Sequence, residues 1–226
     1  MLKLSILIPV YQVEDYVIPC LESVFSQGLD DADFEVIIVN DGTKDRSMEM
    51  IAGMIGQHDN ITVFHQKNQG LSVARNRGIA SARGEYLLLI DSDDLLIENS
   101  VKPLLDKALE SQVDLVVADF LQMNDTEIAA YKGTVQTDIA FEEKSGERLF
   151  LEDLNPRQCF VWRTLFRRRF ITDKQLTFFP GIRYQDVPFT HECYLKAERC
   201  LRTHWLLNIY RKGHPSSTSL FSMSNA

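Results

Sequence analysis

The chain has 226 residues, of which 45% are hydrophobic and 25% are charged, and its net charge at pH 7 is -8. This composition excludes an intrinsically disordered or fibrous chain, and the negative charge argues against a general nucleic-acid-binding protein. The length is typical of one large domain, or of one domain with a small appendage.

The cysteines and the N-terminal segment indicate a reduced, intracellular environment. The four cysteines are widely spaced and form no Cys-x-x-Cys pair, which favours buried thiols over disulfides or a zinc site. The first nine residues lack the long apolar region and cleavage site of a signal peptide. No apolar run approaches the ~20 residues that span a bilayer. We therefore expect a soluble, cytoplasmic protein.

The first half of the chain alternates predicted strands and helices. Apolar runs predict strands at residues 4–10, 34–39, 61–65, 86–90 and 115–118. Between them, apolar side chains at helical spacing predict helices that carry Val17, Met48, Leu71 and Val101. This alternation predicts βαβ units with right-handed crossovers, and therefore an α/β fold with a mainly parallel sheet flanked by helices.

The pattern weakens after Phe120. Residues 124–148 are polar and are typical of a hairpin or a loop, and a helix is expected around residues 147–154. Residues 159–170 mix aromatic side chains with arginines. The favoured interpretation is an amphipathic helix that packs on the sheet through Val161, Trp162, Leu165 and Phe166. The alternative is a basic surface that contacts anionic lipid, or the diphosphate of a lipid-linked acceptor, through Arg167, Arg168 and Arg169.

Three carboxylates follow the fourth predicted strand directly, in the sequence Tyr86-Leu-Leu-Leu-Ile-Asp91-Ser-Asp93-Asp94. Carboxylates this close repel one another unless a cation or hydrogen-bond donors compensate them. A hard divalent metal, Mg²⁺ or Mn²⁺, that shares its ligands with a phosphate is one explanation. An acidic turn whose aspartate caps a helix is the other.

Two further predicted strands end in polar loops, Pro9-Val10-Tyr11 and Asn40-Asp41-Gly42. The ends of parallel strands share one edge of the sheet, where ligands of α/β proteins bind. There, Tyr11 can stack on a base, Asp41 can accept hydrogen bonds from the base or ribose, and a metal at Asp93 would lie on the diphosphate. Because the chain has no Gly-x-Gly-x-x-Gly motif and no Walker loop, the metal would have to neutralise the phosphate charge. The sequence thus predicts a nucleotide-diphosphate site.

Four motifs, in their order and spacing, resemble the family 2 glycosyltransferases with the GT-A fold. They are Ser5-Ile-Leu-Ile-Pro-Val-Tyr11, Ile38-Val-Asn-Asp41-Gly-Thr, Asn68-Gln-Gly70-x-x-x-Ala74-Arg75-Asn76-x-Gly78 and Leu89-Ile-Asp91-Ser-Asp93-Asp94. The resemblance covers at least residues 3–119 and implies an inverting, Mg²⁺- or Mn²⁺-dependent enzyme. It would transfer a sugar from a nucleotide-diphosphate sugar, by analogy a UDP-sugar, to a hydroxyl of a glycan or lipid-linked acceptor. Such enzymes often build bacterial capsule or envelope polysaccharide, at the inner face of the membrane in some cases.

The resemblance also implies roles for individual residues. Nucleotide and donor binding falls to Pro9, Tyr11, Asp41, Arg75, Asp91 and Arg211. Asp93 would ligate the metal, and His214, in a late loop, could touch the phosphate or the metal. For Arg75, an ion pair with one of the site's own aspartates is an equally good interpretation, and an exposed position without a ligand is the alternative for His214.

Asp186 is the candidate general base. The family places a Glu-Asp pair in its second half, and Gln185-Asp186 matches that position with glutamine in place of glutamate. A surface aspartate ahead of a helix is the alternative interpretation. Residues 1–119 would then form the nucleotide-sugar-binding half, and residues 120–226 a smaller acceptor-side half that carries the base.

Two other functions remain open from the sequence. A nucleotide-sugar-binding protein that has lost transfer activity is suggested by Gln185. A sugar-phosphate nucleotidyltransferase also binds metal on an α/β sheet, but it usually has a glycine-rich basic loop after the first strand, where this chain has Tyr11-Gln-Val-Glu14-Asp15.

Overall fold

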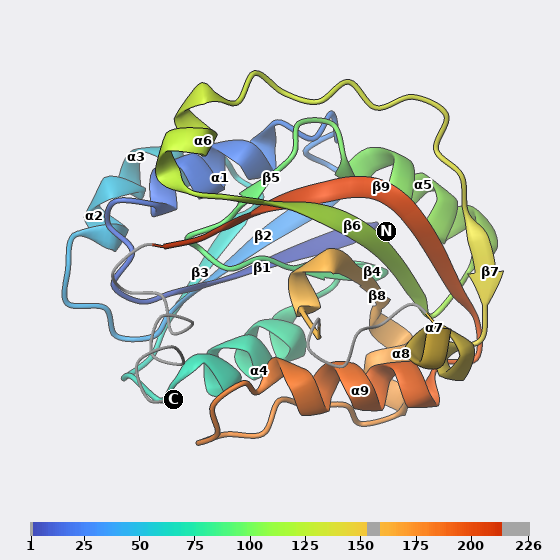
Figure 1. Cartoon of the computed structure of the whole chain (residues 1–226). Helices are drawn as coiled ribbons and strands as arrows, with labels where there is room; N and C mark the ends of the chain where they lie inside the picture. The colour runs from blue at the N-terminus through green and yellow to red at the C-terminus, as the bar shows by residue number, and fades with distance from the viewer. Residues whose placement is uncertain (1, 153–158, 214–226) are drawn as a thin grey trace, which may run out of the picture.

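The computed structural model describes residues 2–152 and 159–213 and shows a curved sheet with helices on both faces (Figure 1). In these residues the strands are β1 (Leu4–Val10), β2 (Phe34–Asn40), β3 (Ile61–His65), β4 (Tyr86–Leu89), β5 (Leu95–Leu96), β6 (Leu115–Met123), β7 (Glu142–Lys144), β8 (Thr164–Arg167) and β9 (Cys200–Arg211). The helices are α1 (Val17–Phe25), α2 (Ser47–Met50), α3 (Ala52–Gln57), α4 (Leu71–Ser81), α5 (Val101–Ser111), α6 (Asp125–Ala130), α7 (Gly146–Glu152), the 3₁₀ helix η1 (Val161–Arg163), α8 (Arg168–Asp173) and α9 (Asp186–Lys196).

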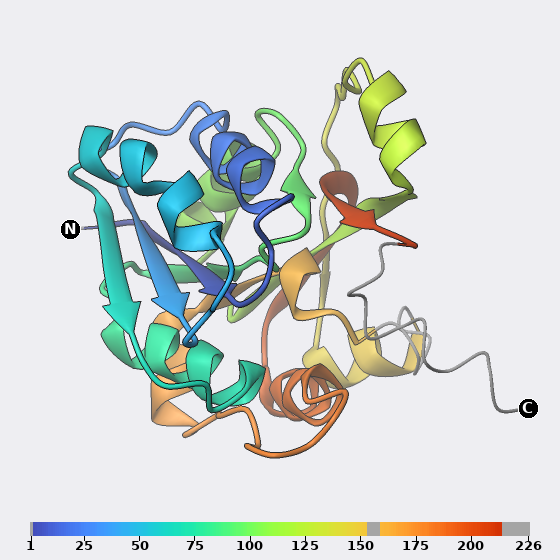
Figure 2. The ribbon, with the colours of Figure 1, turned by 90° about the vertical axis from the view of Figure 1, so that its left-hand side faces the viewer.

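The first half of the chain forms the predicted parallel sheet. Strands β3, β2, β1 and β4 lie side by side in that order and all run in the same direction. Figure 2 shows the arrowheads of β1, β2 and β3 on the same side of the sheet. The predicted strands at residues 4–10 and 61–65 coincide with β1 and β3, and the α/β fold class is confirmed.

The apolar runs of these strands are buried because helices cover both faces of the sheet (Figure 1). Alternate side chains of β1 point to opposite faces. Ile6 belongs to the core beneath α1 and α5, with Leu21 and Leu104. Leu7 belongs to the second core, beneath α4 and α9, with Phe189.

The helix predicted over residues 159–170 is wrong. This segment forms η1, then β8, then the start of α8, and β8 lies antiparallel between β4 and β6. Leu165 packs in one core and Phe166 in the other, so a strand covered on both faces produces the same run of apolar residues as a buried helix. The predicted burial of this segment is confirmed, since Val161, Trp162, Leu165 and Phe166 are at most 2% exposed.

The three arginines at the end of this strand and the start of α8 already have acceptors within the protein. Arg167 donates to the carbonyl of Gln112, and Arg168 donates to the carbonyl of Gly84. Arg169 forms an exposed ion pair with Asp173. In the described part of the chain, no helix has the length and apolar character required to cross a membrane.

The remaining elements modify the predicted outline. The helix expected around residues 48–55 is two short helices, α2 and α3, which are separated at Ile51. The polar stretch of residues 124–148 contains helix α6 and the edge strand β7. A capping box between Asn124 and Glu127 stabilises the start of α6. Strand β9 runs parallel to β6 and antiparallel to β5, and it ends at Arg211, beside the loop that follows β4.

Candidate active site

The loops that follow β1, β2 and β4 meet at one edge of the sheet. The register pairs Val10 with Asn40 and Leu7 with Leu89, so the strands stop close to the same level. The backbone nitrogen of Asp41 donates to the carbonyl of Val10, and that of Ile90 donates to the carbonyl of Leu7. The predicted convergence of these loops therefore follows from hydrogen-bonded register.

The loop after β1 is held against the loop after β2. The backbone nitrogens of Gln12 and Val13 donate to the hydroxyls of Thr43 and Ser47, over 2.8 Å and 3.0 Å. Tyr11 lies at the start of this loop and is 41% exposed, so its ring offers a free surface at the edge of the sheet. Such a surface is available for stacking.

Asp41 is a buried carboxylate that organises the loop before α4. It is 3% exposed and accepts hydrogen bonds from the side chain of Gln66 and from the backbone nitrogens of Gln69 and Gly70, at 2.8–2.9 Å. At the neighbouring Gly42, φ is +70° and a Cβ would lie 2.8 Å from a backbone nitrogen of the same loop, so only glycine permits this approach. The structure thus gives Asp41 a positioning role, and its contact with a nucleoside stays a prediction.

Arg75 joins the two halves of the site. Its guanidinium is 3% exposed, forms an ion pair with Asp91, and donates to the side-chain oxygen of Gln185 over 2.9 Å. The ring of Phe178 lies 5.2 Å from the guanidinium carbon. Of the two interpretations of Arg75, the ion pair with a site aspartate is present in the structure. Helix α4 thereby connects the end of β4 to the start of α9.

The carboxylates after β4 are poorly compensated. Burial is the main cause that raises the pKa of Asp91 and the pKa of Asp94. The negative charge of Asp93 raises both pKa values further, whereas the positive charge of Arg75 lowers the pKa of Asp91. One oxygen of Asp94 accepts a hydrogen bond from the backbone nitrogen of Arg211 over 2.8 Å, whereas its buried Oδ2 has no hydrogen-bond partner among residues 2–152 and 159–213. A buried carboxylate oxygen without a donor is destabilising, and a cation would relieve it.

Arg211 holds the end of β9 against these carboxylates. Its Nε donates to the carbonyl of Asp93 over 2.8 Å, its terminal nitrogen is paired with Asp125, and its guanidinium carbon lies 4.8 Å from the centre of the Tyr16 ring. The predicted contact between Arg211 and a phosphate is not tested by these bonds. The next residue, Lys212, is exposed at the same edge.

Asp186 is the first residue of α9 and follows Gln185, the N-cap. Burial is the main cause that raises its pKa; the positive charge of Arg75 lowers the pKa, and the negative charge of Asp91 raises it further. Arg75 binds both Asp91 and Gln185, the residue before the candidate base, so the carboxylate motif and the start of α9 share one arginine. A raised pKa makes a carboxylate a stronger base once it is ionised.

A metal site is not preformed in the described residues, where no group of three or more His, Cys, Asp or Glu side chains is arranged to hold an ion. His214, one of the two predicted ligands, lies outside the described residues. Asp93, the other, is part of the acidic loop and half-buried.

Sequence reasoning gave no individual role to Asp94 or Asp125, and it did not predict that Gln185 contacts Arg75. Asp94 is more buried than Asp91 and Asp93, and its place in the Asp-Ser-Asp-Asp run was a signal that could have identified it. Asp125 pairs with Arg211 from 86 residues away, and Gln185 binds Arg75 from 110 residues away. No local pattern predicts these two contacts.

Comparison with known proteins identifies the family and the fold. The family model described as Glycosyl transferase family 2 matches residues 5–174. The glycosyltransferase EpsJ of Bacillus subtilis, itself uncharacterized, is 33% identical over 218 residues, which cover 96% of this chain and 63% of EpsJ. The poly(ribitol-phosphate) beta-glucosyltransferase of Bacillus spizizenii is 28% identical over 88% of this chain, but only over 30% of its own length. The chain therefore spans less than two thirds of either relative.

Solved structures show the same fold. S. aureus TarS, residues 1–349 in complex with UDP-GlcNAc, superposes with a TM-score of 0.81 at 22% identity, covering 96% of this chain and 61% of TarS. The mannosyltransferase PcManGT from Pyrobaculum calidifontis, in complex with GDP-Man and Mn²⁺, superposes with a TM-score of 0.68 at 12% identity, covering 96% of this chain and 58% of that one.

Proposed function

Because the chain belongs to glycosyltransferase family 2, we propose that it transfers a sugar from a nucleotide-diphosphate sugar to a hydroxyl group, with inversion at the anomeric carbon. One observation carries the proposal: Arg75 binds Asp91 of the acidic loop and Gln185 beside the candidate base. Donor-binding and base-bearing segments are thereby held at one site.

The donor is a UDP-sugar in this proposal. Tyr11 would stack on the base, Pro9 and Asp41 would line the nucleoside, and Asp91 and Arg75 would approach the ribose or the donor sugar. Arg211, supported by Lys212, would neutralise phosphate charge. The fold neighbour TarS was crystallised with UDP-GlcNAc and with UDP, whereas PcManGT was crystallised with GDP-Man, so the choice of nucleotide needs a direct test.

The residues of the acidic loop fit a hard divalent cation. The buried Oδ2 of Asp94 has no partner, and the pKa of both Asp91 and Asp94 is raised chiefly by burial. Asp93, together with His214, would hold Mg²⁺ or Mn²⁺ here. When bound, the ion supplies charge stabilisation for the departing diphosphate.

Asp186 would act as the general base. The acceptor oxygen forms a bond to the anomeric carbon, the bond from that carbon to the diphosphate oxygen breaks, and the acceptor proton moves to the carboxylate of Asp186. Burial of Asp186 raises its pKa and favours this uptake of a proton, and the positive charge of Arg75 acts in the opposite direction. Gln185 contributes a hydrogen-bond acceptor to Arg75 in place of a second negative charge.

The acceptor is a glycan or a lipid-linked saccharide in this proposal, in bacterial envelope or capsule synthesis on the cytoplasmic side of the membrane. Residues 1–119 would bind the donor, and residues 120–226 the acceptor. Peripheral lipid contact through Arg167, Arg168 and Arg169 would have to compete with the hydrogen bonds that these side chains already make.

A thermal-shift screen of nucleotide sugars with and without Mn²⁺, followed by a nucleotide-release assay, tests the function. We expect one UDP-sugar to raise the melting temperature in a metal-dependent manner, since a ligand stabilises the folded state that binds it. Asp93→Asn should weaken this stabilisation. Absence of stabilisation by any nucleotide sugar would contradict the proposal. Binding without release of UDP, across a panel of glycan acceptors, would favour a binding protein that has lost transfer.

A further inference from the structure

Four aromatic side chains gather on one side of β6 and β9. The rings of Phe160 and Trp162 stack at 4.6 Å with an angle of 11° between their planes, and Tyr210 stacks against both at 5.6 Å and 5.4 Å. Phe120 meets Phe160 and Trp162 edge-on. We call these four residues the aromatic platform. Trp162 is buried, whereas the other three residues are half-buried.

One end of the platform is attached to the helix of the candidate base. Phe160 follows Cys159, whose carbonyl accepts the hydroxyl of Thr190 in α9 over 3.1 Å. Thr190 lies one turn after Asp186. Burial, with the charge of Asp186 as the second cause, raises the pKa of the Cys159 thiol to about 11, which agrees with this proximity.

The other end of the platform is attached to the acidic loop. Tyr210 precedes Arg211, whose backbone nitrogen donates to Asp94 and whose side chain donates to the carbonyl of Asp93. The platform therefore spans from the candidate base to the candidate donor and metal motif. In an inverting transfer the acceptor must lie between these two groups.

A buried amide lies next to the rings without a partner. Asn208 is 0% exposed, and within the described part of the chain neither its side-chain nitrogen nor its side-chain oxygen forms a hydrogen bond. It is the cross-strand partner of Phe120, and it shares a face of β9 with Tyr210, two residues further on. An unsatisfied buried amide destabilises the fold by about 1–3 kcal/mol, which suggests that another group satisfies it in the working protein.

We propose that the aromatic platform binds a sugar ring of the acceptor, and that the Asn208 amide, which is buried in the absence of acceptor, gains a hydrogen bond to a hydroxyl of that ring or to a water molecule when the rings shift to admit it. The C–H bonds on one face of a pyranose carry partial positive charge and pack on the negative face of an aromatic ring. An acyclic polyol phosphate has no such face. The acceptor of this enzyme thus ends in a cyclic sugar, an inference that rests on the proposed transferase function and makes it more specific.

Tryptophan fluorescence tests binding without requiring turnover. The chain has two tryptophans, and Trp205→Phe leaves Trp162 in the platform as the reporter. Methyl β-D-glucopyranoside, methyl N-acetyl-β-D-glucosaminide and ribitol 5-phosphate are titrated in the presence of UDP and Mn²⁺. We expect at least one pyranoside to change the Trp162 emission saturably and ribitol 5-phosphate not to do so. No response to either pyranoside, or an equal response to ribitol 5-phosphate, overturns the proposal.

Kinetics on single variants separate this site from donor binding. Tyr210→Ala and Phe160→Ala should each raise the acceptor KM about tenfold, the effect of losing one stacked ring. The affinity for the UDP-sugar and its slow hydrolysis by water should stay unchanged. Phe25→Ala is the matched control, because Phe25 is also half-buried and stacked, on His58 at 3.7 Å, but belongs to another part of the fold.

An unchanged acceptor KM in both platform variants overturns the proposal, as does a loss of donor hydrolysis equal to the loss of transfer. If the unmodified protein neither binds nor hydrolyses any UDP-sugar, the proposed function fails. The fluorescence titration, repeated without UDP, then still decides whether the platform binds a sugar ring.

Discussion

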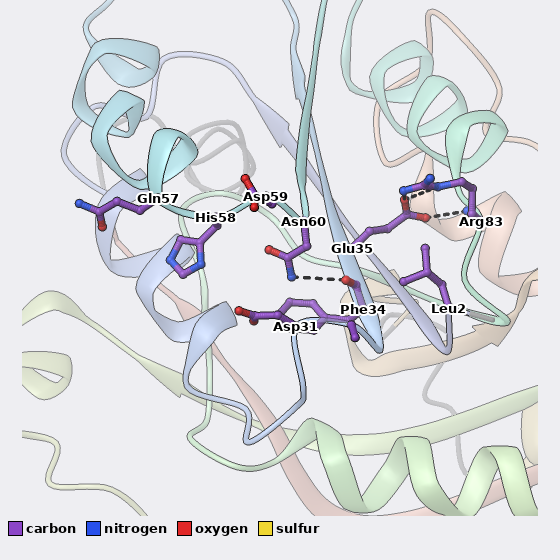
Figure 3. A pocket seen from close by; sticks show the side chains of 10 residues that line it. Leu2, Asp31, Phe34, Glu35, Gln57, His58, Asp59, Asn60 and Arg83 are labelled. Atoms are coloured by element: carbon purple, nitrogen blue, oxygen red, sulfur yellow. Dashed lines mark hydrogen bonds and ion pairs between the residues drawn. The ribbon is translucent and has the colours of Figure 1, made fainter.

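Buried carboxylates at the two ends of the parallel sheet differ in their hydrogen-bond partners. At the end where β1 and β2 begin, Glu35 lies at the side of a hollow of about 480 Å³ (Figure 3). It accepts the Ser5 hydroxyl at 2.7 Å and both the backbone nitrogen and the guanidinium of Arg83. At the end where these strands stop, Asp94 keeps one oxygen without any partner.

The pKa values reflect this difference. Burial alone would raise the pKa of Glu35, but the hydrogen bonds from Ser5 and Arg83 outweigh burial and lower it. At Asp91, Asp94 and Asp186, burial dominates and raises the pKa. A satisfied carboxylate stabilises the fold, and an unsatisfied one is available for a ligand or a proton. We therefore call the end with Glu35 the structural end of the sheet, and the end with Asp91, Asp94 and Asp186 its candidate chemical end.

The largest effect is expected from Asp186→Asn at the chemical end. Loss of a general base should reduce transfer by about 10²–10⁴-fold, while the affinity for the UDP-sugar is retained. Initial rates of UDP release and a donor titration by calorimetry measure the two quantities. Full transfer activity in this variant would reject the assignment of Asp186.

A smaller effect, on stability alone, is expected from Glu35→Gln at the structural end. Its lowered folded-state pKa means that Glu35 stabilises the protein above about pH 4.5, and that this contribution disappears as the pH falls through the lowered value. Glu35→Gln should thus lower the free energy of unfolding by about 2 kcal/mol at pH 7.

Urea unfolding at pH 7 and at progressively lower pH measures this difference. The two proteins should converge in stability at acidic pH, and the KM for the donor should be the same in both. A change in KM would mean that the two ends of the sheet are coupled.

The pH dependence of transfer sharpens the comparison within the chemical end. The rate should fall as the pH drops through the pKa of Asp186, at a midpoint above its ordinary value of 3.8. Arg75 lowers that pKa, so Arg75→Gln should move the midpoint upward by about one pH unit, whereas Arg75→Lys keeps the charge and should move it less.

Profiles of kcat/KM against pH for the folded variants measure this shift, and thermal melts confirm that each variant is folded. An identical profile in the glutamine variant would show that Arg75 acts on Asp186 only through structure.

The smallest effect is expected away from both ends. Lys102 and Asp106 form an i,i+4 pair on α5 whose side chains are about half exposed. Lys102→Ala should change the free energy of unfolding by less than about 0.5 kcal/mol, because solvent screens such pairs. A larger loss in urea unfolding would mean that exposed charges contribute to stability as strongly as the buried Glu35.

Much of the fold could be predicted from local pattern. The predicted elements up to residue 111 agree with the structure to within a few residues, apart from the break at Ile51, because each strand and helix there has its own apolar period and its own polar boundary. The sequence also predicted that Tyr11, Asp41 and Asp91 lie at one edge of the sheet, because the ends of parallel strands share an edge. The prediction failed over residues 159–170 because Val161, Trp162, Leu165 and Phe166 also fit the spacing of one helix face, and β8 is only four residues long.

The sequence by itself predicted which side chains would carry the chemistry and that three strand ends would gather them. Only the tertiary structure decided how these groups compensate one another. Arg75 binds Asp91 and Gln185, and Arg211 pairs with Asp125. One oxygen of Asp94 has no hydrogen-bond partner in the described residues. The tertiary structure also brought the aromatic platform together from β6, η1 and β9. Periodicity is a property of neighbours along the chain, whereas charge compensation and ring stacking depend on contacts across dozens of residues, which no local pattern encodes.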